Sequence, residues 1–326
     1  MDDETHWKEQ LHAQWTTPDE VVDQLVRRAS GSTIGLRSRI VGGEGNEVWS
    51  ITTESGEDLI LRVSRSSSFA AEQWATEQAR RMGVPVPEIL LVDNAVPING
   101  DSERGDIAVA AWIHRTIHGE LLWAMQDEQT ARRLTAEAGE FLARIHAVPM
   151  SGNGWIDALG QGLLDSFYEY LLWDDSAADA ALANGISRTD LDRAARLLET
   201  YSDVWAIPPR LLHGDWLPEH VLVRNGVVVG IIDFGNTRSG DPAYDIAYWQ
   251  FFWDSDLYPT SALVDGYRRD PSAGDLDHLL DLRVHLCRLS LSMRAISYYT
   301  GGGRSFPAQH AAQRFAEALS GLRLAH

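Results

Sequence analysis

The sequence predicts an α+β fold of two lobes: a small antiparallel-sheet lobe over residues 1–116 and a larger, mostly helical lobe over residues 117–326. Two observations predict this class. In the first part, short runs of strand-forming apolar residues alternate with turn segments, and two helical segments accompany them. After Gly119 the chain changes to long stretches with helical periodicity. We therefore place the lobe boundary near residues 114–119.

The first helix is predicted from its N-terminal signals. Thr17 is expected as the cap and Pro18 as the first helical residue, and Glu20 completes a capping box with Thr17. The apolar positions that follow share one face of such a helix: Val21, Val22, Leu25 and Val26.

Five strands and one further helix are predicted in the rest of the first lobe. The strand-like runs lie at 36–41, 47–53, 59–63, 89–92 and 107–113. The helix is predicted over 69–82, because Gly83 ends it and Pro85 and Pro87 prevent its continuation.

Four long helices are predicted in the second lobe, over 130–146, 162–173, 189–201 and 276–299. Two short apolar strands interrupt them. Leu211-Leu212 leads into a polar loop, and Ile231-Ile232 ends at an acid, Asp233.

Composition indicates an ordinary globular protein. The chain has 326 residues, of which 44% are hydrophobic and 23% charged, and its one cysteine, Cys287, excludes an internal disulfide. No apolar run approaches the ~20 residues of a membrane span. The acidic start, Met1-Asp2-Asp3-Glu4, lacks the features of a secretory signal, so we expect a cytoplasmic protein.

The charge balance bears on the partners. A net charge of −19 argues against binding to nucleic acid, whose phosphates are held by clustered basic residues. The acidic surface either attracts a cationic small molecule or serves only solubility. Lys8 is the only lysine in the chain, so a site that needs a basic residue must use arginine.

Three polar residues around the short strands have the spacing of a phosphoryl-transfer site. His220 follows Asp215 by five positions, and Asp233 follows His220 by thirteen, which is the order and spacing of the catalytic and metal-binding loops of kinases. Asp215 is the candidate base that orients an attacking hydroxyl, and Asp233 is the candidate ligand of Mg²⁺. His220 stands where kinases carry asparagine. It would ligate the metal, bond to a metal-bound water or serve the structure alone.

Several motifs together resemble the aminoglycoside phosphotransferase family of kinase-like small-molecule kinases. They are His213-Gly214-Asp215, Ile232-Asp233-Phe234-Gly235 and Gly240-Asp241-Pro242-Ala243-Tyr244-Asp245-Ile246-Ala247. The resemblance covers nearly the whole chain and implies a bilobal, protein-kinase-like fold. The segments 61–63 and 251–253 resemble those of hygromycin kinases, whereas a histidine in the asparagine position, as at His220, is similar to macrolide kinases.

The same resemblance implies nucleotide-binding residues in the first lobe. Arg62 takes the place of the usual phosphate-binding lysine, and either Glu72 or Glu77 is its ion-pair partner. A turn over the phosphates would contain Gly43, Gly45 and Asn46. The segment that bonds to the purine would run from Arg115 to Ile117, with His114 before it.

The expected activity is Mg²⁺-dependent transfer of the γ-phosphoryl group of ATP or GTP to a hydroxyl of a small molecule. An aminoglycoside or aminocyclitol antibiotic is the first expectation for the acceptor, with resistance as the outcome. A macrolide, a sugar or an amino alcohol is the alternative, and a non-catalytic binding module of the same fold is the alternative of another class. The chain would act as a monomer or homodimer. Asp241 and Asp245 are expected to be structural, and the aromatic run 248–253 belongs either to the core or to an acceptor site.

Overall fold

The fold is described from a computed structural model that covers residues 16–41, 46–98, 107–273, 276 and 279–322. The chain divides into two compact units. Unit 1 comprises Met1–Gln73 and Val86–His118, and unit 2 comprises Trp74–Pro85 and Gly119–His326.

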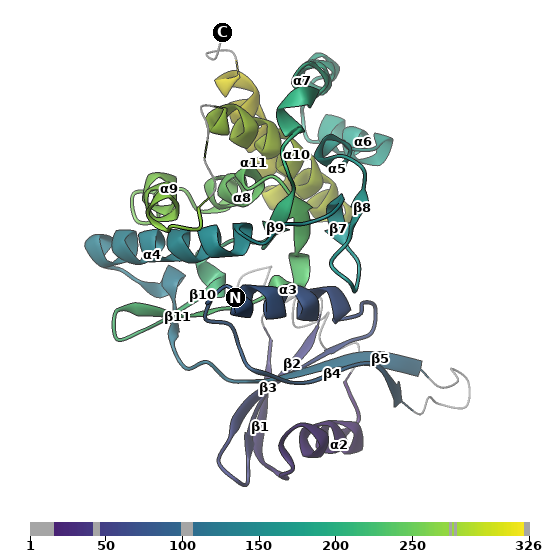
Figure 1. Cartoon of the computed structure of the whole chain (residues 1–326). Helices are drawn as coiled ribbons and strands as arrows, with labels where there is room; N and C mark the ends of the chain where they lie inside the picture. The colour runs from purple at the N-terminus through teal and green to yellow at the C-terminus, as the bar shows by residue number, and fades with distance from the viewer. Residues whose placement is uncertain (1–15, 42–45, 99–106, 274–275, 277–278, 323–326) are drawn as a thin grey trace. The chain divides into compact units, whose positions relative to one another are not determined.

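Unit 1 is built on a five-stranded antiparallel sheet in the order β1-β2-β3-β5-β4. The strands are β1 (Ile34–Ile40), β2 (Glu47–Thr53), β3 (Asp58–Ser64), β4 (Ile89–Ile98) and β5 (Ile107–Arg115). Helix α2 (Asp19–Ser30) covers one face of this sheet (Figure 1), and its apolar residues enter the core of the unit. Strand β4 is longer than the predicted 89–92, because it continues as a pair with β5 and buries Val96 and Ile98.

The predicted capping box at the start of α2 is wrong. The residue before the helix is Pro18, and no side chain caps the helix there. Thr17 is buried instead, and both its amide and its hydroxyl donate to the carboxylate of Glu47 on β2. A tertiary contact therefore takes the hydroxyl that the sequence pattern assigned to the helix. The helix ends as expected for a glycine stop, since Gly31 adopts a φ of 72°.

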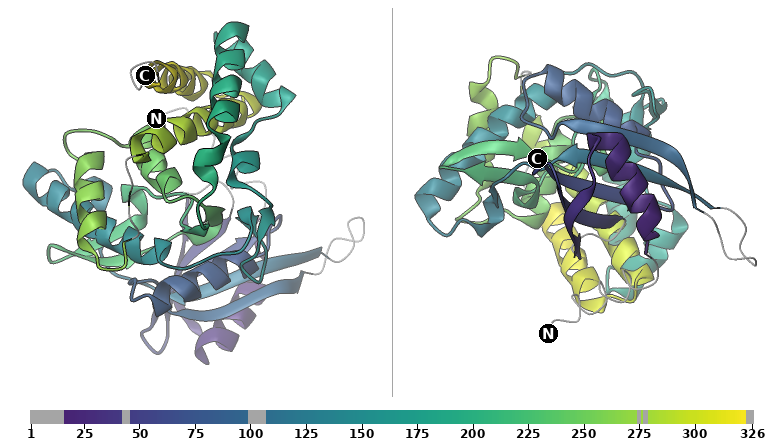
Figure 2. Two further views of the ribbon diagram at one scale, coloured as in Figure 1. Left: turned by 45° about the horizontal axis from the view of Figure 1, so that its top comes forward. Right: turned by 90° about the horizontal axis from the view of Figure 1, so that it is seen from below.

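Unit 2 is mainly helical. Its larger helices are α4 (Glu128–His146), α6 (Asp175–Ala183), α7 (Arg188–Thr200), α8 (Ala243–Phe252), α9 (Thr260–Arg269), α10 (Leu280–Gly301) and α11 (Ser305–Gly321). Helix α10 packs against α6, α8 and α11, and α9 packs on α4 (Figure 2). Helix α3 (Ala70–Arg81) crosses the division between the units. Within the described residues, no helix has the length and apolarity that crossing a membrane requires.

The predicted helix over 162–173 is wrong in its first half. Residues Gly162–Leu164 form strand β8, which pairs with β7 (Asn153–Ile156), and only Phe167–Leu171 is helical, as α5. The pairing brings backbone very close: a Cβ on Gly162 would lie 2.3 Å from the Asn153 amide nitrogen. The Ser166 hydroxyl accepts from the Glu169 amide and begins α5.

Two small sheets in unit 2 carry the loops that matter most. One has the order β11-β10-β6 and the other β8-β7-β12-β9. Their remaining strands are β6 (Glu120–Leu121), β9 (Arg210–Leu212), β10 (Val221–Arg224), β11 (Val227–Ile231) and β12 (Arg238–Gly240).

The β10–β11 hairpin brings two predicted site residues together. Its turn residues, Asn225 and Gly226, both have positive φ, as a tight hairpin requires. Val221 pairs with Ile231, and the Ile232 amide donates to the His220 carbonyl at 3.0 Å. His220, directly before β10, and Asp233, shortly after β11, therefore lie together at the open end of one hairpin.

Candidate active site

A buried histidine organises the loop that follows β9, residues 213–220. The Nε2 of His213 donates to the Ile232 carbonyl at 3.0 Å, and its Nδ1 accepts from the Asp215 amide at 3.3 Å. Burial lowers the pKa of the His213 imidazole, so the ring is neutral and can fill both roles. The ring thereby ties the 213–220 loop to the end of β11.

Position 214, directly after His213, must be glycine. Gly214 has a φ of +81°, and a Cβ there would lie 1.8 Å from the Asn236 carbonyl oxygen. Only glycine combines this backbone conformation with so close an approach. The loop that carries Asp215 is therefore in direct contact with the loop that follows Asp233.

Asp245, in the first turn of α8, fixes the start of the 213–220 loop by accepting hydrogen bonds from its backbone. The two oxygens of its buried carboxylate accept from the amides of His213 and Gly214, each at 2.8 Å, and His146 Nε2 lies 3.0 Å from it. Burial raises the pKa of Asp245, but the hydrogen bond and charge of His146 and the amide donors outweigh burial and lower it. A charged carboxylate thus fixes the backbone on either side of the Gly214 bend.

The Asp215 carboxylate is half-buried beside neutral groups. Its Oδ2 accepts from the Asn236 amide nitrogen at 3.1 Å. Burial and the nearby charge of Asp215 raise the pKa of the Tyr248 phenol well above its usual value, so that phenol keeps its proton. Neutral donors orient a carboxylate without neutralising it, which preserves its capacity to attract the proton of a hydroxyl.

The sequence patterns do not assign Asn236 to the site, and they leave Tyr248 open between the core and an acceptor site. Sequence signals for both exist. Asn236 comes three positions after the metal-binding candidate Asp233, in the same loop. Tyr248 follows Asp245 by three positions on α8, which places both on one side of the helix.

His220 contacts the Asp215 backbone with one ring nitrogen and faces the Asp233 carboxylate with the other. Its Nδ1 is 2.8 Å from the Asp215 carbonyl oxygen, and its Nε2 is 3.7 Å from Asp233 Oδ2. Burial lowers the pKa of His220, but the charges of Asp215 and Asp233 outweigh burial and raise it. The ring also stacks on His213, with centroids 5.9 Å apart.

Asp233 occupies an unusual backbone position. Its φ of 66° and ψ of 64° lie in the left-handed region, which aspartate tolerates better than most residues. Its side chain is 44% exposed, unlike the surrounding apolar residues. Such a conformation is kept where the surrounding structure aims a side chain at a defined place.

The donor set fits a magnesium ion. Because Nδ1 of His220 faces a carbonyl, a neutral ring carries its proton there and directs the Nε2 lone pair towards Asp233. In the parts of the chain that the structure describes, no three His, Cys, Asp or Glu side chains form a metal-binding group. Two protein ligands suit Mg²⁺, which keeps several waters and phosphate oxygens, better than an ion that needs a full protein cage.

In unit 1, Arg62 and Glu72 form an ion pair between β3 and α3. Both side chains are largely buried, at 14% and 7% exposure, and the Arg62 guanidinium lies 5.2 Å from the centre of the Phe69 ring. Glu72, one of the two expected partners, is therefore in contact with Arg62.

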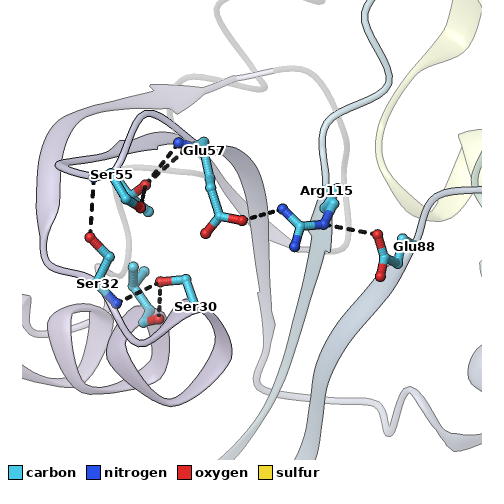
Figure 3. Close-up of polar contacts among 8 residues, drawn as sticks. Ser30, Ser32, Ser55, Glu57, Glu88 and Arg115 are labelled. Atoms are coloured by element: carbon cyan, nitrogen blue, oxygen red, sulfur yellow. Dashed lines mark hydrogen bonds and ion pairs between the residues drawn. The ribbon is translucent and has the colours of Figure 1, made fainter.

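The segment after β5 is fixed by Arg115 (Figure 3). Its guanidinium donates hydrogen bonds to the carboxylates of Glu57 and, at 2.8 Å, of Glu88. On the neighbouring turns, the Ser55 amide donates to the Ser32 hydroxyl, and the Ser32 amide donates to the Ser30 hydroxyl. The side chain of Arg115 is thus engaged within unit 1 and is not directed to a base.

Backbone groups of this segment are partly taken. The Arg115 amide donates to the Glu88 carbonyl and the Thr116 amide to the Asp58 carbonyl, both at 2.9 Å. The Arg115 carbonyl accepts from His114, whose pKa burial lowers to about 4. Within the described residues the Ile117 amide forms no hydrogen bond. Asn46 directly precedes β2, whereas Gly43 and Gly45 lie outside the described residues.

Comparison with known proteins identifies the family. Residues 37–277, more than half of the chain, match the model of the "Phosphotransferase enzyme family". The chain belongs to this phosphotransferase family. The resemblance seen in the sequence is confirmed, and the chain is a small-molecule kinase.

A curated relative supports the same family. A homoserine kinase of Phenylobacterium zucineum (strain HLK1) is 33% identical over 275 residues, which cover 77% of this chain and 76% of that protein.

Solved phosphotransferases share the fold. A thermostable mutant of aminoglycoside phosphotransferase APH(4)-Ia, in a complex with AMP-PNP and hygromycin B, aligns with a TM-score of 0.70 at 19% identity, over 92% of this chain and 98% of that one. The macrolide 2'-phosphotransferase MphH of Brachybacterium faecium aligns with a TM-score of 0.57 at 17% identity, over 91% and 98%. The predicted α+β, kinase-like fold class is confirmed.

Proposed function

We propose that this phosphotransferase moves the γ-phosphoryl group of ATP or GTP to a hydroxyl of a small molecule, with Mg²⁺. The observation that carries the proposal is the cluster of Asp215, His220 and Asp233. It combines a base for the acceptor with a two-ligand metal site, which are the parts that phosphoryl transfer needs.

Asp215 acts on the acceptor. Its carboxylate orients the hydroxyl and takes its proton as the oxygen attacks the phosphoryl group. Asn236 and Tyr248 keep the carboxylate in one orientation, because both are donors beside it. Asp245 keeps the backbone of the loop in place.

Asp233 and His220 would hold the metal. When bound, Mg²⁺ supplies positive charge to the nucleotide phosphates. His220 can ligate only as a neutral ring, so its Nδ1–H must remain on the Asp215 carbonyl. Asp233 contributes a charged oxygen from an exposed position.

The nucleotide is assigned to residues of unit 1. Arg62, held by Glu72, would grip phosphate oxygens with its planar fork. The Arg115 carbonyl, through its second lone pair, and the Ile117 amide would bond to the purine, in keeping with an Ile117 amide that has no partner in the described residues. The glycine turn with Gly43, Gly45 and Asn46 would approach the phosphates through backbone amides.

For the acceptor, we favour a small amino alcohol of the homoserine type. The support is the relative named homoserine kinase, whose identity of 33% extends over most of both chains. The second candidate is an aminoglycoside or aminocyclitol antibiotic, in which case the enzyme would confer resistance. That candidate is favoured by the net charge of −19, which would attract a polycation.

An acceptor screen tests the proposal. The enzyme is incubated with Mg²⁺ and ATP or GTP and with L-homoserine, 3-aminopropan-1-ol, hygromycin B, kanamycin or a macrolide, and the added phosphoryl group is detected by mass. Asp215→Asn should lower kcat by about 100- to 10,000-fold while nucleotide still binds.

The matched control is Asp192→Asn on α7, an exposed aspartate remote in sequence from the cluster, which should leave kcat unchanged. Full activity of Asp215→Asn, or no transfer to any acceptor by the wild type, would contradict the proposal.

A further inference from the structure

Arg238, the first residue of β12, lies in a box of aromatic rings. Its guanidinium carbon is 4.2 Å from the centre of the Trp155 ring, 5.1 Å from that of Tyr244 and 5.5 Å from that of Tyr170. The residue as a whole is only 6% exposed. Ring faces attract a cation, and they also exclude the water that would otherwise solvate it.

The guanidinium is charged but has no counter-charge in contact. Burial lowers the pKa of Arg238, yet the surrounding tyrosines and the more distant Asp245 outweigh burial and raise it. Its Nη1 donates to the Gly214 carbonyl at 2.6 Å, and its Nε is buried without a partner. Among the described residues it forms no ion pair. The third nitrogen, Nη2, forms no hydrogen bond within the described residues and is not sealed from solvent.

Other buried arginines of unit 2 are neutralised. Arg283 lies 2.9 Å from Asp241, and Arg288 lies 3.5 Å from Glu317. A buried cation without an anion is costly, so such positions normally carry a paired carboxylate. Arg238 departs from this rule in a chain with a large excess of acids.

The position of Arg238 links it to the base. Its hydrogen bond goes to Gly214, the residue directly before Asp215. Tyr244 of the box lies on α8, one turn before Tyr248, which adjoins the Asp215 carboxylate. Neighbouring residues are about 3.8 Å apart along the chain, so an anion at Arg238 would lie within several ångströms of the base.

We propose that Arg238 binds a carboxylate group of the acceptor, and that the substrate is a compact hydroxy acid whose hydroxyl reaches Asp215. The inference rests on the proposed function and names the substrate class of that same site. The carboxylate accepts from Nη2 and supplies the missing negative charge, while Trp155, which is 43% exposed, covers it. A multi-ring polycation offers no such group.

Two acceptors that differ only in the carboxylate test the proposal: L-homoserine and 3-aminopropan-1-ol. Since a hydrogen bond to a charged group is worth about 1.5–3 kcal/mol, the wild type should prefer L-homoserine in kcat/KM by about 10- to 150-fold. Arg238→Met should reduce this preference to nearly one by raising the KM for L-homoserine.

Arg294→Met is the matched control. Arg294 also lies over the Tyr170 ring, at 4.3 Å, but it bonds to the Tyr170 carbonyl instead of the 213–220 loop. It should retain the wild-type preference. If Arg238→Met does not fold, thermal shifts of the wild type without nucleotide decide the matter: L-homoserine should raise Tm and 3-aminopropan-1-ol should not.

Three results would overturn the inference. Equal losses with both acceptors in Arg238→Met would mean that the arginine only clamps the loop. A raised KM for the nucleotide alone would mean that it holds a phosphate. Transfer to hygromycin B or kanamycin, with neither turnover nor a thermal shift for L-homoserine, would leave the proposed function intact and remove the carboxylate site.

Discussion

At the scale of single residues, the proposed phosphate-binding site must use arginine wherever it needs a basic side chain, because Lys8 is the only lysine. Arg62 has the geometry for that duty in unit 1, since Glu72 and the Phe69 ring restrict its guanidinium. A restricted fork loses little entropy when it binds phosphate oxygens.

Arg62→Ala should therefore raise the KM for the nucleotide by about 10- to 150-fold, the value of a hydrogen bond to a charged group. The KM for the acceptor should stay within a factor of about two. Arg37→Ala is the control, because Arg37 lies on the same sheet but pairs with the exposed Asp19. Unchanged nucleotide affinity in Arg62→Ala would exclude the assigned role.

Single residues also show what sequence can and cannot predict at a site. Asp215 and His220 share one loop, and His220 and Asp233 flank one hairpin, so the chain order alone predicts that the three lie close together. Arg238 and Tyr248 depend on α8, β7 and β12 meeting in space. Spacing along the chain does not predict contacts between elements that are distant in sequence.

At the scale of elements, a single hydroxyl stabilises the end of the short helix η1 (Leu122–Ala124). The Oη of Tyr258 lies 3.1 Å from the Leu122 carbonyl oxygen and 2.9 Å from those of Trp123 and Met125. The last carbonyls of a helix lack partners further along the helix, and although the Leu122 carbonyl also accepts from the Met125 amide, the single O–H of Tyr258 is shared among the three.

Tyr258→Phe should lower the free energy of unfolding by about 1–3 kcal/mol, because the carbonyls at the end of η1, of which that of Leu122 is buried, lose a shared donor. Urea unfolding followed by fluorescence measures the loss. Tyr168→Phe is the control, since the Tyr168 hydroxyl forms no hydrogen bond within the described residues, and it should be neutral. Equal stability of Tyr258→Phe and the wild type would mean that water replaces the phenol.

Elements also explain the wrong predictions. The run 162–173 has helical periodicity, but β8 forms there because Gly162 permits close pairing with β7. Thr17 has the residue type of a helix cap, but Glu47 of β2 takes its hydroxyl. In both places a partner distant in sequence overrides a local preference.

At the scale of the whole molecule, acid should destabilise the fold by protonating aspartates whose charged form is stabilised by hydrogen bonds and ion pairs. Burial raises the pKa of Asp270, but hydrogen bonds from Ser272 and Arg144 outweigh burial and lower it. The pKa of Asp245 is lowered in the same way by His146 and the loop amides. A lowered folded-state pKa gives stability that is present above the unfolded value of about 3.9 and is lost as the pH falls through the folded value.

The free energy of unfolding, measured in urea from about pH 6 down to about pH 2, should fall below about pH 4. Asp270→Asn should cost about 1–3 kcal/mol at the upper end, where the wild-type carboxylate is charged, and the difference should shrink at the lower end. A difference between the two proteins that is the same at every pH would show that Asp270 contributes no charge-dependent stability.

The β10–β11 hairpin has a consequence for how this chain can vary. His220 and Asp233 stand at its open end, and Asn225 and Gly226 form its closed end. Residues can therefore be added at the tip without moving His220 or Asp233. One residue inserted within β11 would reverse the alternation of its side chains and turn Asp233 away from His220. Among natural variants, length differences should gather at the tip and spare the strands.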